Sequence, residues 1–341
     1  MNPLILSDEY IPKKLLHREE ELDKIRNIFV NFKKFKIGSN MIIFGVSGSG
    51  KTCLIKKVIH EFDNSLFVSG NQCNSSINVL KKLFNIKEGE RHFILESAIK
   101  FLKNKPHILV IDELDKVYDF KRLVNDLNFI YRKTMCPVII ITCKRNILSK
   151  IEIDALKTLF FEKLRLVSYK PNEIRDIIND RINLLGINKS LIPVSFAPHV
   201  SACATYNGSC RLAINLLLRC LQNGRFDDSF VDEVFKDLVA EDWVGFYYDL
   251  NKTERDFLMT VSQLCDYNKE TNMETLNNSL KKMGYNLSLP RLSQIVTLFE
   301  KYSAINSRHK NTGRLGGRKR FIKFSSKEAY ESIIKLLDKD K

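Results

Sequence analysis

Two short groups of residues in the first third of the chain have the types and spacing needed for phosphate chemistry. The first is a run in which a glycine, four residues and Gly-Lys-Thr follow an apolar segment. In a phosphate-binding loop of this spacing, backbone N–H groups surround the phosphates, the lysine reaches the β- and γ-phosphates, and the threonine hydroxyl holds Mg²⁺. We therefore predict an ATP site made of Gly45, Val46, Ser47, Gly48, Ser49, Gly50, Lys51, Thr52 and Cys53, with Lys51 also catalytic and Thr52 a metal ligand.

The second group is the acidic pair Asp112-Glu113, which ends the apolar stretch 107–111. In a parallel sheet, ligands lie beyond the carboxyl ends of the strands, and such a pair fits there. Asp112 would orient the water shell of Mg²⁺, and Glu113 would polarise the attacking water. The alternative interpretation is two acids that cap a strand before a turn. The phosphate-loop sequence earlier in the chain favours the catalytic interpretation.

The elements that must position these residues are visible in the hydrophobic pattern. Apolar stretches typical of strands (42–44, 65–68, 107–111 and 137–142) alternate with segments of helical periodicity (18–32, 54–62, 77–84, 90–102 and 123–131). This alternation predicts an α/β fold with a doubly wound, mainly parallel sheet. We assign residues 1–150 to this nucleotide-binding base domain.

Beyond residue 150 the strand pattern fades and helices are expected at 172–185, 195–206 and 212–221. Pro171 precedes the first of these helices and Gly186 follows it, which are typical start and stop signals. We assign residues 151–240 to an all-α lid that covers the nucleotide.

The last part of the chain, 245–341, has a different pattern. Helices are expected at 252–264, 273–283 and 288–302, followed by two short strands around a loop without acidic residues, within 305–324. This order is typical of a winged helix-turn-helix domain. Cations at the hairpin would contact DNA phosphates, although a solvated basic hairpin is the alternative. The predicted DNA-binding residues are Arg314, Arg318, Lys319 and Arg320.

The composition limits the partners and the compartment. The net charge of +15 and the isoelectric point near 9.3 indicate a polyanionic partner, either nucleic acid or an anionic membrane surface. No apolar run approaches the roughly 18–20 residues that span a bilayer, and residues 1–8 do not resemble a signal peptide. The eight cysteines have no metal-site spacing, so we expect buried thiols in a reducing compartment and no zinc.

Several segments together resemble the archaeal initiator family related to the eukaryotic origin recognition complex and its helicase-loading partner. The segment 10–22, the phosphate loop and Ile111-Asp112-Glu113 are similar to the N-terminal and nucleotide motifs of that family. Tyr169 and the helix after it resemble the family's entry to the lid, and 208–213 resembles its second sensor. The resemblance implies that Tyr169, Arg181 and Arg211 contact ATP.

The resemblance also implies a fold and a function. Members of the family are AAA+ ATPases with an all-α lid and a C-terminal winged helix. The resemblance implies ATP and Mg²⁺ as cofactors, and double-stranded DNA of a replication origin as the partner. It further implies the replicative helicase and other initiator copies as partners, no membrane contact, and a cytoplasmic, nucleoid-associated location. ATP binding with slow hydrolysis would act as a switch.

The chain departs from the family pattern at two positions. The family's first sensor is usually an asparagine after the fourth core strand, and here Thr142 or Asn146 are the candidates. Where an arginine finger is expected, the segment 154–158 offers only Lys157, which lacks the planar fork suited to a γ-phosphate. Hydrolysis is therefore expected to be slow or to need a partner subunit. The alternative function is a regulatory, signalling or mobile-element ATPase whose winged helix binds protein or element DNA.

Overall fold

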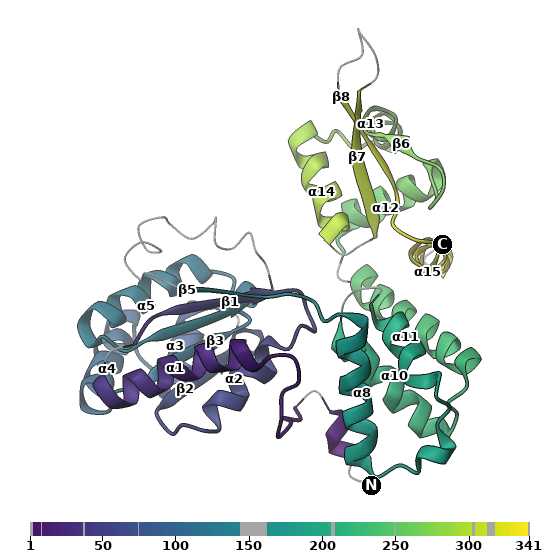
Figure 1. The fold of residues 1–341 in the computed structure, drawn as a ribbon. Helices are drawn as coiled ribbons and strands as arrows, with labels where there is room; N and C mark the ends of the chain where they lie inside the picture. Colours follow the sequence, from purple (N-terminus) through teal and green to yellow (C-terminus); the bar gives the residue numbers. More distant parts are fainter. Residues whose placement is uncertain are drawn as a thin grey trace. The chain divides into compact units, whose positions relative to one another are not determined.

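The computed structural model describes residues 3–7, 9–36, 38–73, 75–143, 162–205, 209–248, 250–301, 304–311 and 318–339. The chain divides into two compact units, Met1–Val231 and Asp232–Lys341 (Figure 1). Within the described residues, no helix is both long enough and apolar enough to cross a membrane.

The first unit contains a five-stranded sheet in the order β2-β3-β4-β1-β5. Its strands are β1 (Met41–Gly45), β2 (Ser65–Ser69), β3 (Ile108–Asp112), β4 (Val138–Thr142) and β5 (Glu162–Leu166). All neighbouring strands are parallel, with Ile42 opposite Ile140 and Ile111 opposite Ile140 on its other side. The predicted parallel sheet is confirmed.

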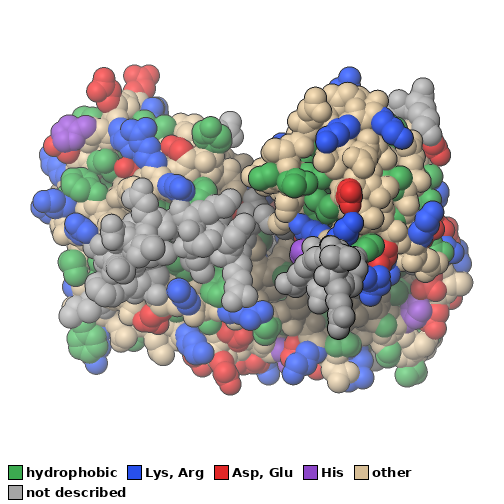
Figure 2. Space-filling model, turned by 90° about the horizontal axis from the view of Figure 1, so that it is seen from above, with side chains coloured by type: hydrophobic (Ala, Val, Ile, Leu, Met, Phe, Trp, Pro, Cys, Tyr) green, Lys and Arg blue, Asp and Glu red, His purple; other side chains and the backbone are tan. Residues whose placement is uncertain are grey.

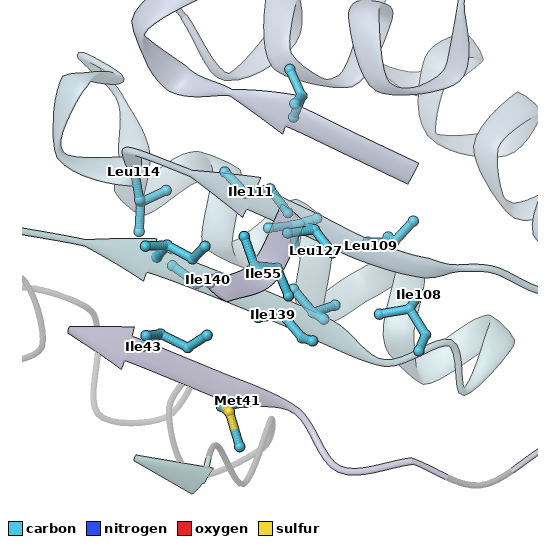
Figure 3. Close-up of a cluster of buried hydrophobic side chains, with 14 of the residues drawn as sticks. Met41, Ile43, Ile55, Ile108, Leu109, Ile111, Leu114, Leu127, Ile139 and Ile140 are labelled. Atoms are coloured by element: carbon cyan, nitrogen blue, oxygen red, sulfur yellow. The ribbon is translucent and has the colours of Figure 1, made fainter. Parts of the chain in front are cut away.

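Helices cover the sheet and close its core. The helices of this region are α1 (Glu19–Phe35), α2 (Lys51–Ile59), α3 (Ser76–Phe84), α4 (Arg91–Asn104) and α5 (Phe120–Thr134), with short 3-10 turns η1 (Pro3–Leu6), η2 (Gly70–Gln72) and η3 (Leu114–Lys116). Helices α1 and α2 pack together, and α3, α4 and α5 pack on one another. Figure 3 shows part of the core, with Ile43, Ile111 and Ile140 of the strands beside Ile55 of α2 and Leu127 of α5. Burial of each such side chain contributes about 1.5–3 kcal/mol, which fixes the strand ends where the site lies.

Strand β5 corrects the predicted end of the base domain. It pairs with β1 along its full length, so the base domain extends to Leu166 and not to residue 150. Only Leu164 and Leu166 of this strand are buried, because β5 is an edge strand with charged residues on its outer positions. A strand with two buried leucines gives too weak an apolar signal to be recognised in the sequence.

The lid lies in the same unit. Its helices are α8 (Pro171–Leu185), α9 (Phe196–Ala204) and α10 (Cys210–Asn223), with the short turn η4 (Lys189–Leu191). Helices α8, α9 and α10 pack on one another, and the three predicted helices are confirmed within a few residues. Helix α11 (Asp228–Tyr248) follows, and the predicted boundaries at residues 240 and 245 both fall inside it. The contact boundary is instead between Val231 and Asp232.

The second unit has the order of elements of a winged helix. The elements are α12 (Lys252–Leu264), β6 (Thr271–Asn272), α13 (Met273–Lys282), α14 (Leu289–Lys301), β7 (Ile305–Asn311), β8 (Arg318–Phe324) and α15 (Lys327–Lys339). The strands form an antiparallel sheet in the order β6-β8-β7. Phe257 and Phe299 stack in its hydrophobic core, with ring centroids 5.2 Å apart. The three predicted helices and the β-hairpin are confirmed.

Candidate nucleotide-binding site

The phosphate loop connects the end of β1 to the start of α2, as its sequence predicted. Gly48 and Gly50 have φ angles of 74° and 89°, which L side chains rarely adopt. At Gly45 a Cβ atom would lie 2.3 Å from the carbonyl oxygen of Leu166. The three glycines are therefore required by the backbone path of the loop.

Lys51 lies inside this loop. Its Nζ donates hydrogen bonds to the carbonyl oxygens of Gly45 and Val46 at 2.9 and 2.7 Å. The side chain is buried, and it begins α2, whose N-terminal end attracts anions. This buried positive charge is placed where phosphate oxygens would compete with the two carbonyls.

Thr52 and Asp112 are brought together although 60 positions separate them. Thr52 Oγ1 donates to Asp112 Oδ2 at 2.7 Å. Burial raises the pKa of Asp112, while the hydrogen bonds from Thr52 and from the Glu113 amide act in the opposite direction. A hydroxyl and a carboxylate at the end of a parallel strand are the oxygen donors that Mg²⁺ prefers, so these residues fit the predicted ion.

Glu113 follows β3 with a left-handed backbone, φ 50°. Ser69 at the end of β2 donates from its Oγ to Glu113 Oε2 at 2.6 Å. Ser69 is not among the site residues predicted from the sequence. The available signal was a polar residue at the carboxyl end of a strand, and register places Ser69 opposite Asp112. This hydroxyl holds the carboxylate that is predicted to polarise water.

Thr142, at the end of β4, is the first-sensor candidate that the structure describes. It is buried, and its Oγ1 donates to Asp115 Oδ1 at 3.0 Å. Because β4 lies between β3 and β1, Thr142 reaches the same edge of the sheet as Asp112 and the phosphate loop. Asn146 and Lys157 lie outside the described residues.

Arg18 connects the N-terminal segment, the phosphate loop and the start of the lid, a role that the sequence analysis did not assign. Its Nη2 donates to the carbonyl oxygens of Val167 and Ser49 at 2.6 and 3.4 Å. Its guanidinium lies 4.0 Å from the centre of the Tyr169 ring, and only 3% of the residue is exposed. Burial raises the pKa of Tyr169, so the phenol stays neutral at the cation–π contact.

Arg181 of α8 is the lid residue with the clearest need for a ligand. The residue is 6% exposed, and its guanidinium stacks 4.5 Å from the Tyr10 ring centre. Its Nε and Nη1 have no hydrogen-bond partner within the described part of the chain. Buried polar groups without partners are costly. Two unpaired donors on a buried cation beside the phosphate loop therefore favour an anionic ligand.

The first turn of α10 lies against the phosphate loop. A Cβ atom on Gly48 would lie 2.0 Å from Ser209 Oγ, so the loop and the lid are in direct contact there. Cys210 next to it is buried, and burial raises the pKa of its thiol to about 12. Arg211, the predicted second-sensor residue, is exposed in the same turn.

One cavity joins these groups. It is lined by residues of the N-terminal segment, the phosphate loop, the strand ends and the lid, among them Tyr10, Ser47, Gly48, Gly50, Lys51, Thr52, Cys53, Asp112, Glu113, Thr142, Tyr169, Arg181, Cys210 and Arg211. Gly45, Val46 and Ser49 belong to the same loop. Residues of the predicted phosphate loop, the acidic pair and the lid thus line one cavity.

The predicted DNA-binding cations are distributed differently in the second unit. Arg314 lies outside the described residues, and Arg318 begins β8. Lys319 Nζ pairs with Glu274 Oε2 at 2.9 Å, with both side chains exposed. Arg320 is not at the hairpin tip as expected. It lies two residues into β8, and its side chain is only 16% exposed.

The fold and the site define a phosphate-loop nucleotide-binding protein with a helical lid and a winged helix. Consistent with this class, residues 37–150 match the AAA domain family. The chain is similar in sequence to proteins named ORC1-type DNA replication proteins. It is 22% identical to ORC1-type DNA replication protein 1 of Halobacterium salinarum over 255 residues, which are 70% of this chain and 79% of that protein. It is 26% identical to the protein of the same name from Methanosarcina acetivorans over 247 residues, 63% of this chain but only 58% of that relative.

Solved structures show that the fold is shared along the whole chain. The structure of the Aeropyrum pernix ORC1 protein in complex with DNA superposes with a TM-score of 0.77 at 18% identity, covering 99% of this chain and 96% of that one. Cdc6p from Pyrobaculum aerophilum superposes with a TM-score of 0.61 at 15% identity, covering 100% of this chain and 99% of that one. The fold is therefore the one expected from the family that the sequence motifs resemble.

Proposed function

We propose that this chain is an ATP-dependent DNA replication initiation factor. It would bind origin DNA and help to recruit or load the replicative helicase, alongside other initiator copies at the nucleoid. The observation that carries the proposal is the single cavity shared by the phosphate loop, the acidic pair and the lid, in a chain that also has a winged helix. The names of the ORC1-type relatives support the same function.

We assign the chemistry of the cavity to four groups. Lys51 and the loop amides would bind the β- and γ-phosphates, and Arg181 would pair its free N–H groups with phosphate oxygens. Thr52 and Asp112 would hold Mg²⁺ directly and through water, and the ion would neutralise developing charge. Glu113 would accept the proton of the attacking water once its carboxylate is released from Ser69.

Two contacts connect the phosphate loop to the lid. Arg18 stacks on Tyr169 at the start of the lid and bonds to Ser49 of the phosphate loop. Ser209 at the start of α10 touches Gly48 of the same loop. A change at the γ-phosphate would therefore be transmitted to the lid through two contacts, which suits a switch with slow turnover.

For DNA, we propose α14 and the β7–β8 hairpin as the contacting elements. Arg291, Gln294 and Thr297 recur every three residues on the exposed face of α14. Arginine, glutamine and threonine can all contact base edges in the major groove. Lys319, together with Arg314 and Arg318, would contact phosphates from the hairpin. On the face drawn in Figure 2, Lys and Arg side chains are interspersed with acidic ones, so net charge alone does not locate the interface.

The test of the proposed function separates turnover, nucleotide binding and DNA binding. Glu113→Gln should lower Mg²⁺-dependent ATP hydrolysis by about 10²–10⁴-fold while leaving nucleotide affinity unchanged. Glu88→Gln removes an exposed carboxylate that does not line the cavity, and it should leave both unchanged. Footprinting on host chromosomal DNA should show protected origin segments. Full hydrolysis by the Glu113 variant would contradict its role, and uniform protection would contradict origin recognition.

A further inference from the structure

Arg320 is the centre of a hydrogen-bonded network that joins the hairpin to α14. Its Nη2 donates to Glu300 Oε2 at 2.9 Å, and its Nη1 donates to Ser293 Oγ at 3.0 Å. Its Nε donates to Ser307 Oγ of β7 at 2.7 Å. Ser307 in turn donates to the other carboxylate oxygen of Glu300. All three nitrogens of the guanidinium therefore have partners inside the second unit.

The geometry of this network fits a brace between two elements. Ser293 and Glu300 are seven residues apart on α14, so they lie on one face two turns apart. The planar fork of arginine presents N–H groups to both positions at once, whereas the lysine ammonium is a compact point charge without that fork. The side chains of Arg320 and Glu300 are only 16% and 30% exposed, so the ion pair is partly shielded from solvent.

The preceding residue of β8, Lys319, has the opposite arrangement. Successive side chains of a strand point to opposite faces, and Lys319 pairs with Glu274 of α13 instead of α14. Both side chains of that pair are well exposed, at 42% and 67%. Exposed pairs of this kind contribute little to stability. Lys319 therefore remains available to a phosphate, whereas Arg320 is committed to α14.

We propose that Arg320 is a positioning residue that fixes the β7–β8 hairpin against α14 and does not itself contact DNA. The inference rests on the proposed function, because it concerns the two elements that would contact the duplex. The brace holds the two elements at a fixed separation before DNA binds. Binding therefore does not lose the conformational entropy of ordering the hairpin.

Substitution of Glu300 distinguishes a phosphate contact from a brace, because the two roles of Arg320 predict opposite changes in DNA affinity. If Arg320 were a phosphate contact, Glu300→Ala would remove a competing negative charge and strengthen binding. If Arg320 is a brace, the same change should weaken binding about tenfold, the scale of a lost charge-assisted hydrogen bond. Arg320→Lys keeps the charge, so it should bind like the wild type in the first case and about tenfold more weakly in the second. Ser293→Ala removes one arm of the network and should have a smaller effect in the same direction.

The experiment measures the affinity of the full chain for a mixed-sequence duplex of ~30 base pairs, about three helical turns. Hydroxyl-radical footprints of the Glu300→Ala and Arg320→Lys variants on that duplex should lose the protection due to the hairpin. They should keep the protection due to α14. Glu274→Ala is the matched control, which removes the exposed partner of Lys319 and should not weaken binding. Thermal unfolding of each variant shows that the domain is folded.

Failure of the positioning role and failure of the proposed function give different results. If the wild type binds the duplex, and Glu300→Ala and Arg320→Lys bind it at least as tightly, the brace is overturned while the proposed function stands. If the wild type itself shows no salt-dependent binding to DNA, the proposed function fails, and the positioning role fails with it.

Discussion

The hydroxyl of Ser69 controls the carboxylate on which turnover is proposed to depend. While Glu113 Oε2 accepts the hydrogen bond from Ser69, that oxygen is not free to accept a proton from water. Glu113 itself has a left-handed backbone conformation, and Ser69 holds its carboxylate by this hydrogen bond. At the scale of one residue, Ser69 is therefore expected to restrain hydrolysis and not nucleotide binding.

Ser69→Ala should raise the rate of ATP hydrolysis about three- to tenfold, since the Ser69 hydroxyl no longer occupies Glu113 Oε2. Nucleotide affinity should not change, because Ser69 does not line the cavity. Ser65→Ala, on the same strand, is the matched control and should have the wild-type rate. A rate below that of the wild type would show that Ser69 positions Glu113 productively instead of restraining it.

How much of the site could be predicted from the sequence depends on how far apart its interacting residues lie along the chain. The phosphate loop and Asp112-Glu113 are local motifs, so they could be placed from spacing alone. Ser69 and Arg18 act through partners 44 and 149 positions away, and only the fold brings them into contact. Arg320 was assigned to DNA because its charge is visible in sequence, whereas its partners on α14 are not.

At the scale of elements, the contact between the phosphate loop and α10 offers a sharp test. Gly48→Ala places a methyl group within 2.8 Å of Ser209 Cβ and 3.1 Å of its Cα, so the start of α10 must move away. This should weaken ATP binding at least tenfold, on the scale of ~1.4 kcal/mol. Isothermal titration with ATP and Mg²⁺ measures the change.

Gly224→Ala is the control for backbone strain, because Gly224 ends α10 with φ 64° and open space around it. Its cost should be the left-handed strain alone, about 1–2 kcal/mol of stability, with ATP affinity unchanged. Equal ATP affinities in the two variants would show that the contact with Ser209 does not matter for binding.

Acidic residues of the second unit should weaken DNA binding by the hairpin. Glu270 pairs with Arg308 at 2.5 Å and with Lys310 at 2.7 Å, and hydrogen bonding from Lys310 lowers the pKa of Glu270. Glu270→Gln should therefore release both cations, tighten binding several-fold and steepen the logarithmic salt dependence by ~0.9 for each of the two cations that gains a phosphate contact. Glu331→Gln, which frees Lys327 on α15, is the matched control. An unchanged salt slope would place Arg308 and Lys310 outside the interface.

The elements that sequence reasoning missed share a physical cause. Helices with a strong apolar face and strands buried on both faces, such as β3 and β4, were found because burial selects their residues. Strand β5 was missed because an edge strand buries only alternate residues. The domain boundary was misplaced within α11, because the two units divide inside a continuous helix and no linker composition marks the division.

At the scale of the whole molecule, the division at Val231 and Asp232 predicts how ligands affect stability. Each unit has its own hydrophobic core, and the nucleotide cavity lies entirely in the first unit. A ligand stabilises only the cooperative unit that binds it, by about 2.7 kcal/mol at a concentration of 100 Kd. Calorimetry of the full chain should therefore show two transitions.

ATP with Mg²⁺ should raise only the transition of the first unit, by about 5–10 °C at that concentration, given ~2–4 °C per kcal/mol for a unit of this size. Duplex DNA should raise the transition of the second unit. Lys51→Ala assigns the first transition, because it removes the buried ammonium group of the phosphate loop and should abolish the shift with ATP. If both transitions moved together with ATP alone, the units would unfold as one body. The nucleotide could then act on the winged helix through folding cooperativity, without a switch in the lid.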